Sequence, residues 1–520
     1  MKRLTTILVS LLLTCTVFPA PRQLRILESL SMYSEILGRE VKFSLCLPEK
    51  YYMEKTAYPV VYLLHGLGDD ETSWLEYGRI SQVADRLTEE REIGPMIFVM
   101  PQGFRCYYSN DFDGKFRYQD MLIEELIPYI DKHYRTIPDR QQRATIGYSM
   151  GGFGALILPL KHPEAFQTCV AMSISVRTDA QYMEEYAPEW DQQWGQIFGG
   201  AGATGKARLT NFYKENSPFH IFEKENLSDL KALNIYITNG DDEHTLCRSN
   251  EELHILMRDK GIPHEYRVGN GGHEFSFWRG ELINGLCYIS DGFAGKEYRG
   301  DKPGVSLLNT VNDPAFTFVR IEGKKYLTAV PAEYELTDRK YPVLYLAGSL
   351  DETTEKQVAS VISTQITNGI FPPAILVFVN GQGAELNEGF FTDMEKKLRI
   401  RPGYRFRSVI GFKDGAVGAL DCGIRPDIIS SCILMDGIFN QVKPNNKLET
   451  IDPELVKRTW FYVSAPDNGV AYRENGDIHM MLRDKDIYHE YRVRDGEGGE
   501  AWFCMNLTEA LDFIAKKFHN

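Results

Sequence analysis

The residues around Ser149 have the types and spacing that nucleophilic catalysis by a serine requires. They read Gly147-Tyr148-Ser149-Met150-Gly151, which fits the pattern Gly-x-Ser-x-Gly. The residues before them, Ala144–Ile146, have the composition of a strand, and residues 152–160 after them have that of a helix. A strand-turn-helix corner strains the serine and exposes its hydroxyl above a sheet. We therefore predict a nucleophile at Ser149; the alternative is a glycine-rich turn with an idle serine.

A base must take the proton of this hydroxyl, and His273 is the candidate. It stands in a Gly-Gly-His loop directly after a predicted strand, Glu265–Val268. A third group, an acid between serine and histidine in the chain, orients the imidazole. Two carboxylates, Asp242 and Glu243, follow the predicted strand Asn234–Thr238, and both are candidates for this acid.

Backbone N–H groups must stabilise the negative oxygen of a tetrahedral intermediate. One donor follows the nucleophile directly, which is the N–H of Met150. The second donor comes from the loop after an early strand, and the loop after Val60–Leu64 offers Gly66 or Leu67. His65 precedes these residues, and we expect it to shape the loop and not to serve as a second base.

The sequence repeats itself, which indicates a duplicated domain. Three stretches of the first half return in the same order in the second half. The pairs are 58–64 with 341–347, 143–156 with 407–420, and 257–268 with 482–493. The second copy is shorter, mainly between its serine-like corner and its last strands.

The second copy lacks the candidate catalytic groups. The positions that differ are Ser149 against Lys413, His273 against Gly498, and Glu243 against Asn468. Asp242 faces another aspartate, Asp467, so the comparison slightly favours Glu243 as the acid. We predict that the second copy kept the scaffold and lost the chemistry.

Short apolar runs alternate with helical patterns in the first copy, which predicts an α/β fold with a mostly parallel sheet and helices on both faces. A chain of 520 residues exceeds what one core normally supports, so we expect two such domains in tandem. Their predicted ranges are 21–296 for the catalytic domain and 305–520 for the non-catalytic one. Predicted strands are Val60–Leu64, Met96–Met100, Ala144–Ile146, Phe166–Met172, Asn234–Thr238 and Glu265–Val268; predicted helices are Gln119–Tyr134 and Asn250–Lys260.

The N-terminus has the layout of a secretory signal peptide over residues 1–20. Two basic residues, Lys2 and Arg3, precede an apolar stretch at 7–13, and small residues follow. Cys15 loosely fits a lipoprotein box, so a lipid anchor at Cys15 is an alternative to a periplasmic or extracellular form. No later segment is long and apolar enough to span a bilayer.

The net charge and the cysteine pattern limit which ligands and substrates the protein is expected to bind. A formal net charge of −14 works against nucleic acid binding and fits a soluble enzyme with a neutral or weakly charged substrate. The nine cysteines, Cys15 among them, are scattered and show no metal-ligand spacing. We therefore expect neither a metal nor a cofactor.

Together these motifs resemble the putative esterase family of α/β-hydrolases. That family includes feruloyl and acetyl xylan esterases of carbohydrate esterase family 1, esterase D (S-formylglutathione hydrolase) and mycolyltransferases. The resemblance rests on residues 62–66, 147–155 and 262–278 and covers roughly 25–293. It implies two α/β-hydrolase domains, the second degenerate. It also implies Ser149 as nucleophile, His273 as base and Met150 as oxyanion donor, with Glu243 where the family typically has an aspartate.

An aromatic segment between Ile174 and Phe219 is absent from the second copy. Trp190 and Trp194 in this segment, and Trp278 near His273, are candidate substrate-binding residues, because aromatic rings can stack on sugars or phenolic acyl groups. The alternative is that these rings pack the segment onto the domain. With the export signal, the segment favours a secreted serine esterase that removes feruloyl or acetyl groups from polysaccharide.

Two other functions stay open at this stage. An acyltransferase or thioesterase would use the same acyl-enzyme. A non-catalytic carbohydrate-binding or scaffolding protein would leave both copies inert and would not react with a fluorophosphonate probe.

Overall fold

The computed structural model describes residues 25–301, 316–320, 326–331, 334–335, 337–367, 370–425, 427–439, 453–456 and 458–519. The predicted signal segment, residues 1–20 with Cys15, lies outside these residues, and so do residues 302–315 around the predicted start of the second domain at 305. Among the helices of the described part, none combines the length and hydrophobicity needed to cross a membrane.

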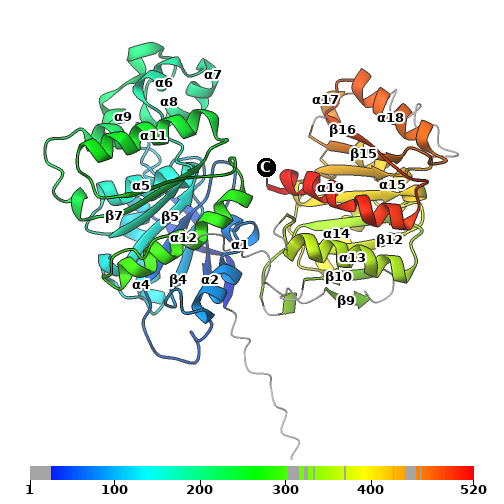
Figure 1. Ribbon diagram of the computed structural model, residues 1–520, viewed down its shortest axis with the longest axis horizontal. Coiled ribbons are helices and arrows are strands. Elements are labelled where there is room, and N and C mark those ends of the chain that lie inside the picture. Colours follow the sequence, from blue (N-terminus) through cyan, green and yellow to red (C-terminus); the bar gives the residue numbers. More distant parts are fainter. Residues whose placement is uncertain are drawn as a thin grey trace, which may run out of the picture.

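The first half of the chain forms an eight-stranded sheet with the order β1-β2-β4-β3-β5-β6-β7-β8. Figure 1 shows this half, coloured blue to green, with α12 on one face of the sheet. The first two strands pair antiparallel, as do β2 and β4, and all other neighbours pair parallel. The strands are β1 (Ile26–Ser34), β2 (Arg39–Cys46), β3 (Val60–Leu64), β4 (Ile97–Pro101), β5 (Arg143–Tyr148), β6 (Thr168–Met172), β7 (Asn234–Gly240) and β8 (Glu265–Gly269).

The second half forms a sheet with the same arrangement, β9-β10-β12-β11-β13-β14-β15-β16. Its first two pairings are again antiparallel and the rest parallel. The strands are β9 (Thr317–Arg320), β10 (Leu327–Val330), β11 (Val343–Gly348), β12 (Ile375–Asn380), β13 (Arg407–Phe412), β14 (Ser431–Met435), β15 (Trp460–Pro466) and β16 (His489–Arg494). The predicted α/β fold with two mostly parallel sheets is therefore confirmed.

Helices cover both faces of the first sheet, which explains why its central strands are apolar throughout. Alternate residues of β3 point to opposite cores: Val61 and Leu63 pack with α2 and α12, whereas Val60 and Tyr62 pack with α4, α5 and α11. The helices are α1 (Ser73–Glu76), α2 (Ile80–Glu89), α3 (Tyr118–Met121), α4 (Ile127–His133), α5 (Met150–Lys161), α6 (Asp179–Glu184), α7 (Ala187–Glu189), α8 (Gly195–Phe198), α9 (Asn211–Asn216), α10 (Pro218–Phe222), α11 (His244–Asp259) and α12 (Phe275–Phe293).

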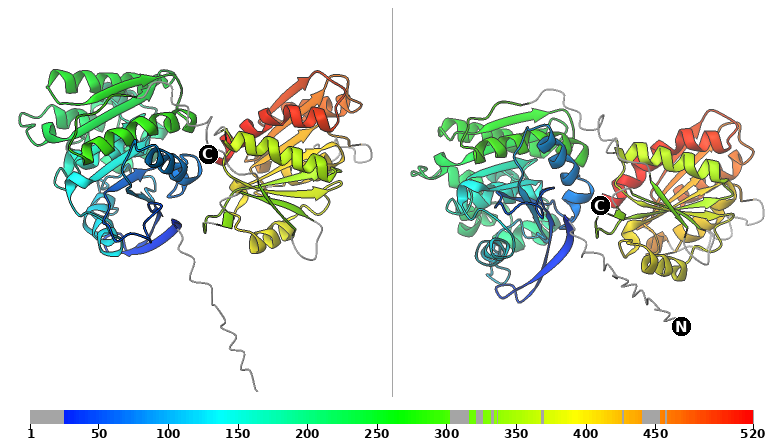
Figure 2. Two further views of the ribbon diagram at one scale, coloured as in Figure 1. Left: turned by 60° about the horizontal axis from the view of Figure 1, so that its bottom comes forward. Right: turned by 90° about the horizontal axis from the view of Figure 1, so that it is seen from below.

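The second sheet is likewise covered on both faces, with α13 and α19 on one side and α14, α15 and α18 on the other. Figure 2 shows the two sheets as separate lobes, each with its own helices. The helices are α13 (Glu352–Thr367), α14 (Glu388–Lys397), α15 (Ala416–Gly423), α17 (Pro453–Val456), α18 (Tyr472–Asp484) and α19 (Glu500–His519).

Two features differ from the sequence prediction. The antiparallel edge strands β1 and β2 were not expected. The predicted helix Gln119–Tyr134 is present as α3 and α4, but a π-helical turn, η1 (Leu122–Leu126), joins them. Pro128 at the start of α4 has no N–H to donate to the preceding turn, which accounts for the change of hydrogen-bond pattern there.

The two lobes are joined by a buried ionic contact. Arg401 of the second lobe lies 2.9 Å from Glu28 and 3.2 Å from Glu76 of the first. Nearby, the hydroxyl of Tyr77 donates to the carbonyl oxygen of Phe518 in α19 at 2.5 Å.

Candidate active site

Ser149 occupies a sharp corner between β5 and α5. Its backbone has φ +58° and ψ −119°, a conformation that non-glycine residues rarely adopt. Glycines on either side permit it: a Cβ at Gly147 would lie 2.2 Å from the carbonyl oxygen of Gly151, and a Cβ at Gly151 would lie 2.1 Å from that of Leu64. The tight packing of strand against helix therefore requires both glycines.

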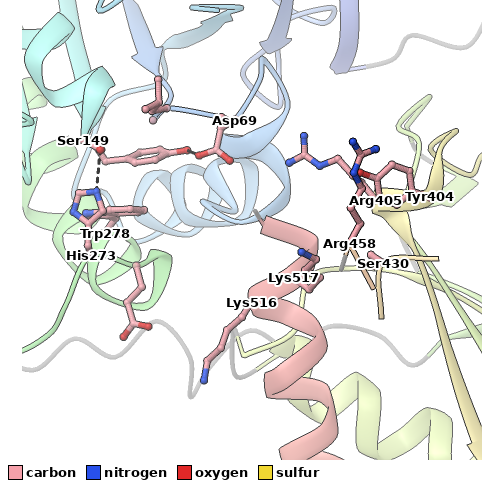
Figure 3. Close-up of a pocket in the computed structure, with 15 residues that line it drawn as sticks. Asp69, Ser149, His273, Trp278, Tyr404, Arg405, Ser430, Arg458, Lys516 and Lys517 are labelled. Atoms are coloured by element: carbon pink, nitrogen blue, oxygen red, sulfur yellow. Dashed lines mark hydrogen bonds between the residues drawn. The ribbon is translucent and has the colours of Figure 1, made fainter. Parts of the chain in front are cut away.

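A chain of hydrogen bonds links Ser149 to His273 and Glu243. Nε2 of His273 lies 2.9 Å from Oγ of Ser149 (Figure 3). Nδ1 of the same ring lies 3.2 Å from Oε2 of Glu243. A carboxylate only accepts, so Nδ1 carries the proton and Nε2 is free to accept the serine proton. The loop after β8 supplies the histidine, and the residue before α11 supplies the acid.

The carboxylate of Glu243 is fully buried and held from several directions. It accepts hydrogen bonds from the backbone N–H of Gly240 at 3.0 Å and from the hydroxyl of Ser173. Ser173 in turn accepts from the indole N–H of Trp278 at 2.8 Å. A buried carboxylate needs such partners to stay ionised. The side chain of His273 is 39% exposed and therefore accessible to substrate.

The other candidate acid, Asp242, does not take part in this chain. Its side chain is exposed, and its contribution is a backbone hydrogen bond from its N–H to the carbonyl oxygen of Gly271 at 3.0 Å. Its neighbour Asp241 accepts from the N–H of Gly271 at 3.0 Å. Of the two candidate acids, the geometry therefore favours Glu243. Asp241 and Asp242 instead bond to Gly271 in the loop that carries His273.

Ser149 and His273 open into a cavity of about 780 Å³. Its first-domain lining includes Gly66, Leu67 and Trp278. This volume is typical of a site for a small molecule or part of a polymer. A strained serine with an oriented imidazole, facing such a cavity, has the arrangement that acyl transfer through a serine requires.

Comparison with known families gives the same assignment. Residues 34–289 match the family described as Putative esterase. These residues belong to the Putative esterase family. The match ends within α12, so it spans the first sheet and the segment from α6 to α10.

Several relatives of this esterase-family domain are known. An endo-1,4-beta-xylanase/feruloyl esterase from Xylanibacter ruminicola is 36% identical over 151 residues, which are 27% of this chain and 20% of that protein. An acetyl esterase from Caldicellulosiruptor saccharolyticus is 23% identical over 273 residues, which are 50% of this chain and 97% of that protein. A solved ferulic acid esterase has 27% identity and a TM-score of 0.44 over 51% of this chain and 98% of its own. The chain thus spans only a fifth of the first of these relatives.

The predicted oxyanion donors lie around the nucleophile. Met150 is the first residue of α5, where a helix leaves N–H groups without intrahelical acceptors. Gly66 and Leu67 follow β3 and line the cavity. His65 holds their loop: its Nδ1 donates to the carbonyl oxygen of Gly66, and its Nε2 accepts from the N–H of Gly103, both at 2.7 Å. This agrees with the predicted loop-shaping role of His65.

Trp190 and Trp194, the predicted substrate-binding residues of this segment, are buried and are not among the residues that line the cavity of Ser149. Trp190 is 0% exposed and donates to the carbonyl oxygen of Gly200 at 2.8 Å, and Trp194 is 2% exposed with its ring 4.3 Å from that of Tyr107. Their rings pack the segment from α6 to α10 onto the domain, because these large apolar side chains are buried on the inner side of its short helices.

Trp278 lines the cavity but is itself only 2% exposed. Its ring stacks on Tyr148 at 4.2 Å and meets the imidazole of His273 edge-on at 5.0 Å. These contacts orient the histidine and the strand of the nucleophile. Its position therefore favours support of the triad over stacking on substrate.

Ser173 is a site residue that the sequence reasoning missed. It lies directly after β6, beside the strand that carries the nucleophile, and has φ +48°. The repeat did not mark it, because the equivalent position after β14 is Asp436, and the φ of +48° that the two residues share is visible only in the structure. A strained position shared by two equivalent corners is a reason to inspect its side chain.

Proposed function

We propose that this protein is a serine carboxylic ester hydrolase that acts through an acyl-enzyme on Ser149. The observation that carries the proposal is the hydrogen-bonded chain from Ser149 through His273 to a buried Glu243, set on a strained corner that faces a cavity. Membership of residues 34–289 in an esterase family supports it.

The chemistry follows from the positions of the protons. As the Ser149 oxygen attacks the ester carbonyl, its proton passes to Nε2 of His273, and Glu243 stabilises the resulting imidazolium. The negative oxygen of the tetrahedral intermediate lies near the N–H of Met150 and those of the Gly66–Leu67 loop. The imidazolium gives its proton to the leaving alcohol. Water then attacks the acyl-enzyme and passes a proton to His273. The imidazolium gives this proton to the Ser149 oxygen as the acyl C–O bond breaks, which releases the carboxylic acid and the free serine.

The substrate we propose is an acylated saccharide, with a feruloyl or acetyl group as the acyl part. Relatives described as a feruloyl esterase and an acetyl esterase support this class. The signal-like residues 1–20 support export to the periplasm or the exterior, or a lipid anchor at Cys15. Cell fractionation tests the location, and mass spectrometry of the N-terminus tests cleavage against lipidation.

We further propose that the second domain is a degenerate copy without catalysis. Shared details support a duplication: in each domain a histidine pair, His254 with His264 and His479 with His489, is joined by a 2.8 Å hydrogen bond. Both domains also have a non-glycine residue with positive φ at the strand-to-helix corner, which is Ser149 in the first and Lys413, with φ +48°, in the second.

The structure of the second domain also leaves no room for a histidine at Gly498, the position equivalent to His273. A Cβ at Gly498 would lie 2.3 Å from Oδ2 of Asp436, and the backbone there has φ +87°. In a Ser149→Ala background, Lys413→Ser should therefore restore no activity. Turnover by that double variant would refute the degenerate-copy proposal.

The central test uses the full chain and its Ser149→Ala variant with p-nitrophenyl acetate and methyl ferulate. We expect turnover by the first and only background hydrolysis with the second. Equal rates would refute the proposed function. Polysaccharide retention without any turnover by either protein would support the binding-protein alternative instead.

A further inference from the structure

The cavity that contains Ser149 has a second wall, which the other domain supplies (Figure 3). The residues of this wall come from the loop and turn before β13, the starts of β14 and β15, and the last turns of α19. They are Tyr404, Arg405, Ser430, Arg458, Lys516 and Lys517. Four of the six are cationic, which is unusual in a chain whose formal net charge is −14.

The negative charges of the cavity lie on the opposite side. Asp69 and Glu274, both of the first domain, are the carboxylates that line it. Asp69 is engaged there, because it accepts from the hydroxyl of Tyr148 at 2.6 Å. Four cations of the second domain thus face two carboxylates of the first domain across the cavity. The positive charge therefore lies on the wall opposite Ser149.

These cations do not make the ionic contact between the two domains, because Arg401 makes that contact, with Glu28 and Glu76. The guanidinium of Arg458 lies 3.2 Å from Asp427 within its own domain, and both side chains are more than half exposed. The ammonium of Lys517 lies 4.2 Å from the ring centroid of Trp460. Burial, followed by the charge of Arg405, lowers the pKa of Lys517, as expected where cations crowd together.

We infer that the site prefers esters whose saccharide part carries an anionic group, and that the second domain recognises this group. The inference rests on the proposed function, since it names the substrate class of the same site. The acyl group lies at Ser149, and the acidic saccharide reaches across the cavity to Arg405, Arg458 and Lys517. This revises the expectation of a neutral or weakly charged substrate: net charge describes the whole surface, whereas one wall of a cavity that is lined mainly by cations sets its own local field.

The expected size of the preference is moderate. Each exposed ion pair contributes little, so three cations together should favour an anionic substrate by roughly tenfold in kcat/KM at low salt. Because exposed charges are screened within about 8 Å at physiological ionic strength, added salt should reduce the preference.

The test compares two feruloylated xylo-oligosaccharides that differ only in a glucuronic acid branch. We expect the acidic ester to have roughly tenfold higher kcat/KM, falling toward equality in 0.5 M NaCl. The triple variant Arg405→Ala/Arg458→Ala/Lys517→Ala should bring the ratio close to one. A matched control, Lys356→Ala/Lys397→Ala/Arg483→Ala, removes three exposed cations of the same domain that do not line this cavity and should keep the ratio.

The outcomes separate this inference from the proposed function. Hydrolysis of neither ester by the wild type would overturn the esterase proposal. Hydrolysis of both at equal kcat/KM at low salt, or an unchanged ratio in the triple variant, would overturn the charge recognition alone. A sulfated ester of the same length, preferred as strongly as the carboxylated one, would support recognition of negative charge in general; preference for the carboxylate alone would support recognition of the uronic acid.

Discussion

Oε2 of Glu243 lies 3.2 Å from Nδ1 of His273, on the side of the imidazole that faces away from Ser149. The adjacent carboxylate, Asp242, is exposed and bonds to the loop through its backbone. Two neighbouring acids that the sequence leaves nearly equivalent therefore have different roles in the fold.

This difference predicts opposite effects of two isosteric variants. Glu243→Gln should lower kcat by at least ~100-fold, because an amide cannot stabilise the imidazolium and disturbs its tautomer. Asp242→Asn, the matched control, should stay within about twofold, since its carboxylate makes no contact with the triad. The measurement is steady-state kinetics with methyl ferulate. A larger loss in the Asp242 variant would reverse the assignment.

Ser173 should act as a positioning residue. Ser173→Ala removes the shared partner of Glu243 and Trp278 and should cost about 1–3 kcal/mol of stability. It should also lower kcat more than it changes KM, and alter the pH profile of kcat/KM, because the acid that orients His273 is less well held. Ser175→Ala removes a neighbouring hydroxyl, bonded to Tyr107, and serves as control. Equal kinetic effects of the two variants would contradict the role.

Trp190 should contribute to stability and not to substrate binding. Trp190→Ala should cost about 3–5 kcal/mol in chemical unfolding, because it empties a fully buried site. Well below the unfolding transition, KM should stay near the wild-type value. A raised KM at unchanged stability would support the predicted role in stacking on substrate instead.

Glu76 makes the stability of the folded chain depend on pH. Burial is the largest influence on this carboxyl and raises its pKa to about 7 from an ordinary 4.5, although Arg401 opposes the shift. The folded state therefore holds a proton that the unfolded chain has released. The resulting stability is complete below pH 4.5 and is lost as the pH rises to 7, by up to about 3 kcal/mol.

Unfolding midpoints of the wild type and Glu76→Gln between pH 4.5 and 8 measure this contribution. The difference between the two proteins should grow as the pH rises, because glutamine cannot ionise. A constant difference across that range would mean that Glu76 does not titrate there.

The corner at Ser149 could be predicted from sequence because its requirements are local. Only glycine fits at positions 147 and 151, so the pattern itself reports the packing. His273 could be predicted because the repeat separated it from the histidines that both copies share. The central strands were found for a similar reason, since burial on both faces makes them apolar throughout.

What could not be predicted depends on contacts between distant segments. Periodicity does not tell whether the rings of Trp190 and Trp194 point outward or inward. The edge strands β1 and β2 have mixed burial and so lack a continuous apolar run. Ser173 meets Glu243 across 70 residues of sequence, and the cations of the second domain line the cavity of Ser149 only because the two domains meet there.

Covalent labelling tests the central claim most directly. The full chain and Ser149→Ala are treated with a fluorophosphonate probe, and the adduct is located by mass spectrometry. The account predicts a single adduct on Ser149, formed rapidly in the wild type, slowly in His273→Ala, and absent from Ser149→Ala. An unlabelled wild type, or an adduct that persists in Ser149→Ala, would contradict it.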